Sequence, residues 1–398
     1  MKIVDEGYKE AIKVLEHCAK LSGFYASGLP GGYEATWARD SMIASLGASL
    51  VENKFKVPFR KSLELLGKNQ SEKGQIPNAV GCYNEERKSD TTFNSIDSSL
   101  WYIIGHYVYS RAYRDHQFLK RNKKKLEKAL LWIQYQDPNE DGLPVQQPTM
   151  DWEDAFPHKY GRTINTQALY YFILKITKNI KEANKLKKIV NGEQEKYLSL
   201  YSKRLGFYHP WIWKTHGPDF REGEDWFDTL GNLLAIITGL ATPKISKSIL
   251  NYIEKNKINR PFPCKSIWPP IEKRDGAWHD YFEHAEARKP YHYLNAGVWP
   301  FIGGFYVAAL VKTKNYTKAK KELENLARVN KIGRRLSQYN NSKILSRHDL
   351  KNKWQFLEWV EGKKGKVAGS SSPYQGWSAG AYLFAYESVR SRKTPFFE

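Results

Sequence analysis

Apolar residues recur at three- and four-residue spacing through the whole chain, whereas the strict alternation of half-buried strands is scarce. The pattern therefore predicts an all-α protein. The expected helices cover residues 4–22, 37–52, 57–70, 95–112, 116–135, 163–177, 181–202, 226–239, 244–256, 294–312, 316–329 and 374–391.

These helices alternate in composition. Even-numbered helices are apolar, aromatic or rich in small residues, as in residues 100–105 and 296–305, whereas most odd-numbered ones are lysine-rich and amphipathic. A helix that is apolar all round is buried, and one with a polar face lies outside. We therefore expect an inner layer of helices surrounded by an outer layer. Pro300 indicates that the helix over 294–312 kinks or begins near that residue.

The links between helices alternate in length. Because successive helices run antiparallel, every long link should emerge at the same end of the bundle, and long loops usually carry function. Six pairs closing on themselves would form an (α/α)6 barrel, expected as one domain over residues 1–398. An open helical solenoid is the alternative, but the chain has no fixed-period repeat. The long links lie at 71–94, 136–162, 203–225, 257–293 and 330–373, and the short ones at 113–115, 178–180 and 313–315.

Composition narrows the class of protein. With 41% hydrophobic and 14% aromatic residues, the chain can bury a large core and still present flat rings to a sugar. The net charge of +21 raises the possibility of a polyanion partner. However, lysines fall on one helical face, as in residues 118–126, and no recognition motif accompanies them, so nucleic acid is not expected. The charged start of the chain and the absence of roughly 20 consecutive apolar residues predict a soluble cytoplasmic protein.

Cysteine and metal chemistry are not expected to contribute. Cys18, Cys82 and Cys264 are scattered, without metal-ligand spacing or the density of a disulfide scaffold, so we interpret them as reduced thiols. No cluster of Cys, His and acidic residues has ligand spacing, and neither a metal nor a cofactor is predicted.

Four acidic motifs with tryptophan fall at the expected long links and inner-helix starts, at residues 37–40, 95–101, 151–155 and 358–362. Hydrolysis of a glycosidic bond usually employs two carboxyl groups. An aromatic pocket raises a carboxyl pKa by penalising its charged form, so Asp154, near Trp152 and Phe156, is a candidate acid. Each acid could also have a purely structural role. An Asp before a helix commonly caps it, and Glu358 lies in a charged run, where a solvated glutamate is usual.

These motifs resemble those of the neutral/alkaline invertases of plants and cyanobacteria and, more distantly, the glucosidase domain of glycogen-debranching enzymes. The resemblance spans most of the chain. The segments that carry it are Trp37–Asp40, Ile96–Trp101, Asp154 with Gly161 and Thr166–Tyr170, Thr229–Leu233, Tyr291–Pro300, Glu358–Gly362 and Gly376–Ser378.

The resemblance implies an inverting mechanism in which Asp154 is the general acid and Glu358 the general base that activates water on the opposite face. In such enzymes the two carboxyl groups are roughly 6.5–9.5 Å apart. It further implies that Arg39 and Asp40 bind sugar hydroxyls, while Trp299 and Trp377 could equally belong to the core. The residues expected to bind or line the sugar site are Trp37, Arg39, Asp40, Asp97, Trp101, Trp152, His292, Trp299 and Trp377.

The sequence leaves the substrate open between sucrose and another short α-linked glucoside or oligosaccharide. Residues 155–159 replace an arginine-rich turn of the invertases, and residues 152–155 are closer to debranching-type α-glucosidases, whereas residues 229–233 favour the invertases. A sugar epimerase using His279, His284 or His292, a phosphorylase and a non-catalytic carbohydrate-binding protein are the alternatives. The oligomeric state is open as well.

Overall fold

The computed structural model describes residues 2–84, 89–194, 199–215, 221–333 and 351–398. These residues form thirteen α-helices and two short 3-10 helices. The α-helices are α1 (Ile3–Cys18), α2 (Ala38–Ala48), α3 (Lys56–Lys68), α4 (Asp97–Tyr113), α5 (His116–Arg121), α6 (Lys123–Gln134), α7 (Ile164–Ile176), α8 (Ile180–Val190), α9 (Thr229–Thr238), α10 (Pro243–Lys255), α11 (Pro300–Lys312), α12 (Tyr316–Asn330) and α13 (Gly376–Ser391).

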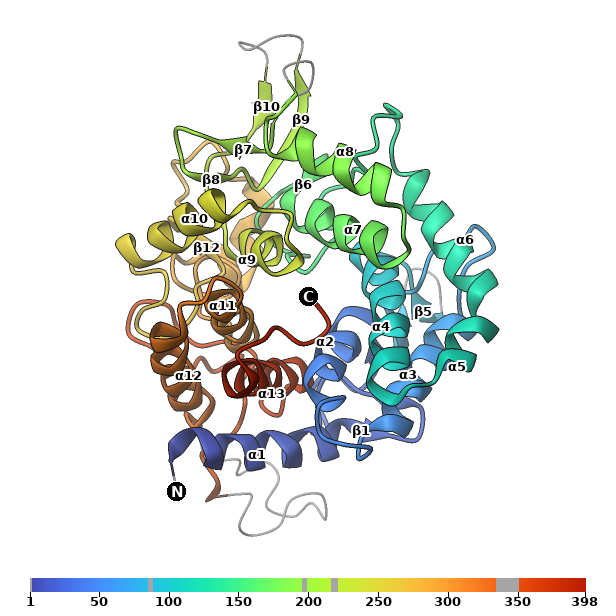
Figure 1. The fold of residues 1–398 in the computed structure, drawn as a ribbon. Helices are drawn as coiled ribbons and strands as arrows, with labels where there is room; N and C mark the ends of the chain where they lie inside the picture. Colours follow the sequence, from blue (N-terminus) through green and yellow to red (C-terminus); the bar gives the residue numbers. More distant parts are fainter. Residues whose placement is uncertain (1, 85–88, 195–198, 216–220, 334–350) are drawn as a thin grey trace.

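Six helices contact one another in a closed ring, and Figure 1 shows how they are arranged. Each contacts the next in the order α2, α4, α7, α9, α11 and α13, and α13 in turn contacts α2. Every residue of α2, every residue of α9 and the stretch Pro300–Val311 of α11 are buried. An apolar helix without a polar face cannot be placed at the surface without exposing its side chains to water. The predicted inner layer is therefore observed.

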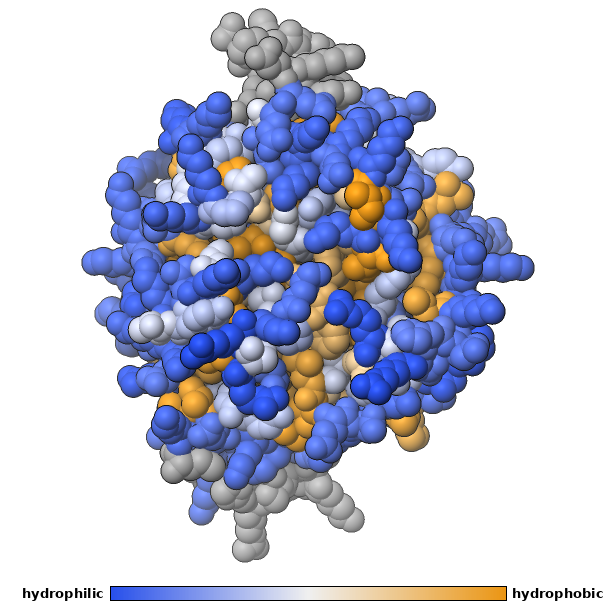
Figure 2. All heavy atoms as spheres, viewed as in Figure 1, coloured by the Kyte–Doolittle hydropathy of each residue, from blue (hydrophilic) through white to orange (hydrophobic). Residues whose placement is uncertain are grey.

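The remaining helices surround this ring and have the opposite composition. In α10, for example, Ile245, Ile249 and Ile253 are buried, whereas Lys247 and Lys255 on the other face are not. A spacing of four residues keeps these isoleucines on one side of the helix. Hydrophilic side chains accordingly cover most of the face shown in Figure 2. The lysine-rich faces that produce the high net charge are solvated, as the sequence predicts.

All six ring helices begin at the same kind of junction. The backbone at or just before each first turn is hydrogen-bonded to the carbonyl of a distant link, which ties the link to the helix start. The bonds are Ala38 N to Asn78 O, Ile96 N to Met150 O, Ile164 N to Pro210 O, Thr229 N to Ser266 O, Val298 N to Val360 O and Gly376 N to Ala26 O. The long links therefore converge on the N-terminal end of the ring.

Short antiparallel strands occur within these links, in five small sheets of two or three strands. Alternation over so few residues is not visible in the sequence. The strands are β1 (Ala19–Lys20), β2 (Gly23–Phe24), β3 (Thr36–Trp37), β4 (Ala79–Asn84), β5 (Ser89–Thr92), β6 (Arg162–Thr163), β7 (Tyr201–Ser202), β8 (Phe207–Tyr208), β9 (Trp211–Thr215), β10 (Arg221–Gly223), β11 (Phe227–Asp228) and β12 (Ile267–Trp268). The chain is thus helix-rich rather than purely helical.

Three predicted helices differ most from the observed ones. The helix expected over 116–135 is divided into α5 and α6 at Asn122, whose side-chain amide donates to Phe118 O and competes with the helical backbone. The helix expected over 181–202 ends at Val190, before Gly192 adopts a positive φ of 75°. The helix expected over 294–312 begins at Pro300, a residue suited to a first helical position.

Ring closure requires glycine where α2 and α13 meet. A Cβ atom built on Gly47 would lie 1.9 Å from Gly380 O, and one on Gly380 would lie 2.4 Å from Ala44 Cα. The obstacles are backbone atoms, so no side-chain rotation can relieve the overlap. The two helices therefore pack with their backbones in contact.

We expect Gly47→Ala to lower the free energy of unfolding by roughly 1–3 kcal/mol, because overpacking outweighs the gain in helix propensity. Urea unfolding followed by circular dichroism measures this. Gly276→Ala is the matched control, since a Cβ at Gly276 meets nothing within 4 Å. Equal midpoints for the two variants would contradict the proposed close contact.

Candidate active site

Arg39 joins three of the predicted acids at the N-terminal end of the ring. It lies in the first turn of α2, and its side chain is 4% exposed. Its Nη1 donates to both carboxylate oxygens of Asp97, at 3.1 and 3.0 Å, while Nη2 lies 3.6 Å from Asp154 Oδ2. Its Nε lies 4.0 Å from Asp40 Oδ2. Residues from α2, α4 and the α6–α7 link thus meet at one guanidinium.

The protein around this cluster disfavours ionised carboxylates. Burial raises the pKa of Asp40 to about 6, with Arg39 opposing and Asp154 adding to the rise. Although 37% of the Asp154 side chain is exposed, burial also raises its pKa to about 6, against the attraction of Arg39. Burial alone would lower the pKa of Arg39, but the neighbouring carboxylates outweigh this and raise it. Arg39 therefore stays charged while Asp154 can hold a proton near neutral pH.

Glu358 reaches the site from the link between α12 and α13, and its side chain is buried. Tyr33 donates its hydroxyl to Glu358 Oε1 at 3.1 Å, and the Ser372 N–H donates to Oε2 at 3.4 Å. Burial raises the pKa of Glu358 to about 8, the two hydrogen bonds oppose the rise, and the charges of Asp40 and Asp154 add to it. Glu358 consequently shares one electrostatic environment with the Arg39 cluster.

Two tyrosines lie near both predicted catalytic acids. Burial and the charge of Glu358 raise the pKa of Tyr33 and of Tyr293, and the charge of Asp154 raises both further. The Tyr33 ring meets Trp37 edge-on, with the ring centres 5.8 Å apart. Tyr33 thus contacts Glu358 directly, and the charges of Asp154 and Glu358, which come from two separate links, both act on the two phenols.

Three of the predicted tryptophans form an aromatic cluster with Phe301. Trp377 stacks on Phe301 with ring centres 4.3 Å apart, and Trp299 meets Trp152 and Trp377 edge-on at 5.6 and 5.8 Å. All three tryptophans are buried. The indole N–H of Trp299 donates to Tyr293 O, whereas those of Trp152 and Trp377 have no hydrogen-bond partner among the described residues. Such unpaired donors suit a hydroxyl-bearing ligand.

The two remaining predicted residues have different surroundings. Trp101 is 1% exposed, and its ring centre lies 6.4 Å from that of Phe305 on α11, which places it in the core of the ring. His292 is partly exposed, with Nδ1 3.5 Å from Glu286 Oε1 and its ring 5.8 Å from Trp359. Among the described residues, these contacts do not include a member of the Arg39 cluster.

A second ionic cluster lies next to the first. Lys159 Nζ lies 3.0 Å from Asp151 Oδ2, 2.5 Å from Glu153 Oε2 and 3.1 Å from Asp228 Oδ2, and all four side chains are 0% exposed. Asp151 and Glu153 are therefore enclosed and paired, whereas Asp154 is the acid of this segment that reaches the surface.

Several residues of the site have only weak signals in the sequence. Tyr33, which bonds to Glu358, follows two glycines shortly before the Trp37–Asp40 motif, and Lys159 stands out only as a departure from the invertase pattern. Asp228 resembles an ordinary helix cap, and it does cap α9 through the Gly231 N–H at 2.9 Å. A sequence pattern cannot show that these side chains meet.

Metal-type clusters, apolar helices, cysteines and cavities among the described residues are features that could indicate other chemistry. Among the described residues, no group of three or more His, Cys, Asp or Glu side chains could hold a metal ion, and no helix is long and apolar enough to cross a membrane. Cys18 and Cys264 are buried free thiols.

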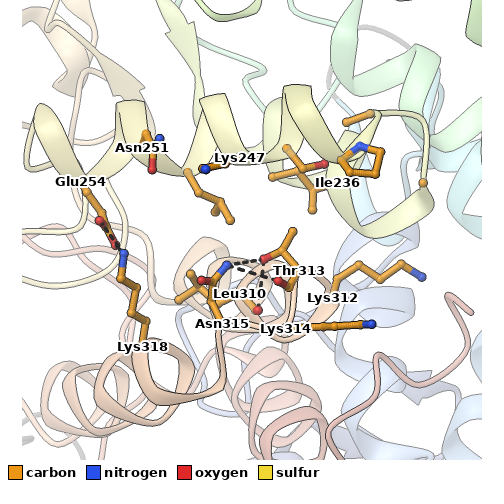
Figure 3. A pocket seen from close by; sticks show the side chains of 15 residues that line it. Ile236, Lys247, Asn251, Glu254, Leu310, Lys312, Thr313, Lys314, Asn315 and Lys318 are labelled. Atoms are coloured by element: carbon orange, nitrogen blue, oxygen red, sulfur yellow. Dashed lines mark hydrogen bonds and ion pairs between the residues drawn. The ribbon is translucent and has the colours of Figure 1, made fainter.

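A cavity of about 700 Å³ lies between α10 and the α11–α12 turn (Figure 3). Lysines such as Lys247 and Lys314 line it, and it contains none of the predicted site residues.

Comparison with known proteins identifies the chain. Residues 15–215 match the family model described as amylo-alpha-1,6-glucosidase, and residues 206–391 match the model for alkaline and neutral invertase. Both families are those expected from the motifs. The chain belongs to the glycoside hydrolases. Within them it is a member of the amylo-alpha-1,6-glucosidase family, whose model covers half of it, and it is related to the alkaline and neutral invertases through its C-terminal half.

Individual relatives match about half of the chain or slightly less. Cytosolic invertase 1 of Oryza sativa subsp. japonica is 29% identical over 42% of this chain. Probable alkaline/neutral invertase A, chloroplastic, of Arabidopsis thaliana is 27% identical over 51%. The matched parts are 25% and 31% of the lengths of these two relatives.

Solved structures are similar over nearly the whole chain. A GH63 mannosylglycerate hydrolase from Thermus thermophilus has a TM-score of 0.62 at 12% identity, covering 96% of this chain and all of that one. A wild-type glycosidase has a TM-score of 0.64 at 11% identity, covering 98% of both chains. At such identities the similarity shows the fold alone, which is that of helix-rich glycosidases.

We expect Asp97→Asn to lower the free energy of unfolding by about 3–5 kcal/mol, because it removes the bidentate partner of a buried guanidinium. Glu254→Gln, which breaks the more exposed pair with Lys318, should cost less than about 1 kcal/mol. Denaturant unfolding of both variants makes the comparison. Similar losses would mean that the Arg39–Asp97 pair does not stabilise the fold.

Proposed function

We propose that the protein is an inverting glycoside hydrolase that cleaves sucrose or a short α-linked glucoside with Asp154 and Glu358 as its catalytic pair. The observation that carries the proposal is that the two carboxyl groups come from separate links and lie in one buried, charged region: Glu358 accepts the Tyr33 hydroxyl, Asp154 lies 3.6 Å from Arg39, and the charge of Asp154 adds to the raised pKa of Glu358. Hydrolysis of a glycosidic bond needs two carboxyl groups, one protonated and one ionised. Their elevated pKa values suit proton exchange near neutral pH.

We further propose that the ring and its surrounding helices are an (α/α)6 barrel formed by a single domain. The closed contact order α2–α4–α7–α9–α11–α13 supports this, because an open solenoid would leave α2 and α13 apart. The division of α5 from α6 adds a helix to the outer layer without adding a member to the ring.

The sugar would lie beside Arg39 and Asp40, with the tryptophans around it. A fork-shaped guanidinium and a carboxylate make charge-assisted hydrogen bonds of defined geometry with sugar hydroxyls. The indole donors of Trp37, Trp152 and Trp377, unpaired among the described residues, support a hydroxyl-rich ligand. The contribution of Trp101 would be to the core that holds α4 against α11.

The acid and base roles rest on the resemblance, in which Asp154 is the acid and Glu358 the base. In the free protein, however, the pKa of Glu358 is the higher of the two, near 8 against 6. Glu358 therefore keeps its proton to a higher pH than Asp154 does. This order favours Glu358 as the acid and Asp154 as the base. An experiment that separates proton donation from water activation is therefore required.

The leading alternative is a debranching-type α-glucosidase that cleaves α-1,6-linked glucose. It is supported by the amylo-alpha-1,6-glucosidase match over the N-terminal half, which includes Asp154. A panel of sucrose and α-linked glucosides with anomer-resolved product analysis decides between the substrates and also tests inversion. Cleavage accelerated by phosphate would indicate a phosphorylase, and binding without turnover would indicate a carbohydrate-binding protein.

An epimerase has less support. His279 packs against His158 with ring centres 4.3 Å apart, whereas His292 packs against Trp359. The two histidines thus lie in different surroundings. Epimerisation transfers protons at a single sugar carbon, so it would require its histidines to lie together. Release of two sugars from a disaccharide would exclude an epimerase.

Cytoplasmic location stays a prediction, since the invertase relatives include cytosolic and chloroplastic proteins.

We expect Asp154→Asn and Glu358→Gln each to lower kcat on the natural glycoside by about 10²–10⁴-fold, the usual contribution of general acid or base catalysis. An α-glucosyl fluoride separates the roles, because fluoride leaves without needing a proton. If Asp154 is the acid, Asp154→Asn should keep most of its activity on the fluoride. Glu358→Gln, which lacks the base, should lose activity on both substrates. Near-wild-type turnover of either variant on the natural substrate would refute the assignment.

We expect kcat/KM to follow a bell-shaped pH profile with limbs near pH 6 and pH 8, from the pKa values of Asp154 and Glu358. Below the lower limb both carboxyls are protonated and no base remains, and above the upper limb both are ionised and no acid remains. Initial rates from about pH 5 to 9 measure the profile. With the fluoride substrate, which needs only the ionised base, the rate should not fall at high pH, and its single rise should lie near pH 8, the pKa of the proposed base Glu358. A flat profile on the natural substrate would contradict the pair.

A further inference from the structure

Lys159 is a completely buried lysine in the segment that carries Asp154. The segment starts at Asp151, contains Glu153 and Asp154, and returns to the interior at Lys159, whose ammonium contacts both Asp151 and Glu153. The same ammonium donates to Asp228 Oδ2 at 3.1 Å. Since Lys159 bonds to the start of its own segment, it closes residues 151–159 into a compact loop.

The loop is attached to a ring helix through Asp228. The second carboxylate oxygen of Asp228 accepts the Gly231 N–H at 2.9 Å and caps α9. Asp151 Oδ1 accepts the Glu153 N–H at 3.0 Å, which fixes the backbone directly before Asp154. Lys159 therefore links the backbone beside Asp154 to the N-terminus of α9, a rigid part of the ring.

The electrostatics keep this link intact. Burial alone would lower the pKa of Lys159, but Asp151, Asp228 and Glu153 together outweigh it and hold the pKa well above its usual value. Burial, with repulsion from Asp228 and Asp151, raises the pKa of Glu153 well above its usual range against the attraction of Lys159. The ammonium therefore lies among the carboxyl groups of Asp151, Glu153 and Asp228, and none of these side chains is exposed.

We propose that Lys159 is a positioning residue that holds the Asp154 carboxyl against Arg39 and aims it at the departing group of the substrate. The inference rests on the proposed function, in which Asp154 takes part in catalysis as the acid. Lys159 itself does not touch the substrate, because its side chain is 0% exposed. A displacement of about 1 Å in a catalytic group can lower a rate by about 10²-fold, so the position of this loop matters for turnover.

The test compares two substrates with the same sugar, the natural glycoside and the α-glucosyl fluoride. Lys159→Met keeps an unbranched side chain one atom shorter than lysine and removes its charge. It should lower kcat on the natural glycoside by about 10²-fold, while kcat on the fluoride changes by less than about 3-fold and KM stays within a few-fold. Circular dichroism and thermal unfolding establish that the variant is folded. An equal loss on both substrates overturns the proposal, because general damage to the fold does not discriminate between leaving groups.

Lys265→Met is the matched control for the loss of a buried lysine. Lys265 is 5% exposed and donates to the backbone carbonyls of Lys257 and Arg260. Its substitution should affect the two substrates equally, whatever its effect on stability.

Asp151→Asn covers the case in which Lys159→Met does not fold. It keeps the acceptor for the Glu153 N–H and removes one charge that Lys159 contacts. We expect a loss of about 10-fold on the natural glycoside and a smaller one on the fluoride. Equal losses would again overturn the proposal. Asp154→Asn serves as the reference, because if it lowers both rates equally, the acid assignment fails independently of Lys159.

Discussion

The candidate site depends on the contacts between the buried guanidinium of Arg39 and the carboxylates around it. Three carboxylates, from Asp40, Asp97 and Asp154, lie around it in a region where burial disfavours their charged forms. Carboxylates that lie this close to one guanidinium repel one another, and the repulsion is stronger in a buried region than in water. The cation, held by the bidentate contact with Asp97, compensates for part of this repulsion. It leaves Asp154 loosely held at 3.6 Å, partly exposed and able to exchange a proton.

The ring of helices creates the conditions for that contact. The long links meet the N-terminal ends of the ring helices, so Arg39 and Asp40 in the first turn of α2 lie close to Asp97, the first residue of α4. Helix N-termini favour nearby negative charge, which suits a site made of carboxylates. Closure of the ring in turn relies on Gly47 and Gly380, where α2 and α13 approach too closely for any side chain. Around Lys159, by contrast, every charged group is enclosed, and access to solvent is what separates Asp154 from Asp151 and Glu153.

The sequence by itself determined that the chain is helix-rich, and it indicated the segments from which the candidate site is proposed. Helical periodicity depends on local spacing, and an all-apolar helix such as α11 has to be buried, so the two layers and the end at which the links gather could be predicted. Motifs such as Trp37–Asp40 likewise carry their similarity to known families in a few adjacent residues. The short strands and the break at Asn122 could not be predicted, because they depend on backbone bonds to distant links or on a single side chain.

Only the tertiary structure decided which side chains meet. The bond from Tyr33 to Glu358, the position of Trp101 in the core and the four-residue cluster at Lys159 join segments far apart in the chain, so no local pattern encodes them. The pKa values of Asp154 and Glu358 are likewise set by burial and by charges that folding brings near. Desolvation and Coulomb energies depend on distance in space, which the order of residues along the chain does not express.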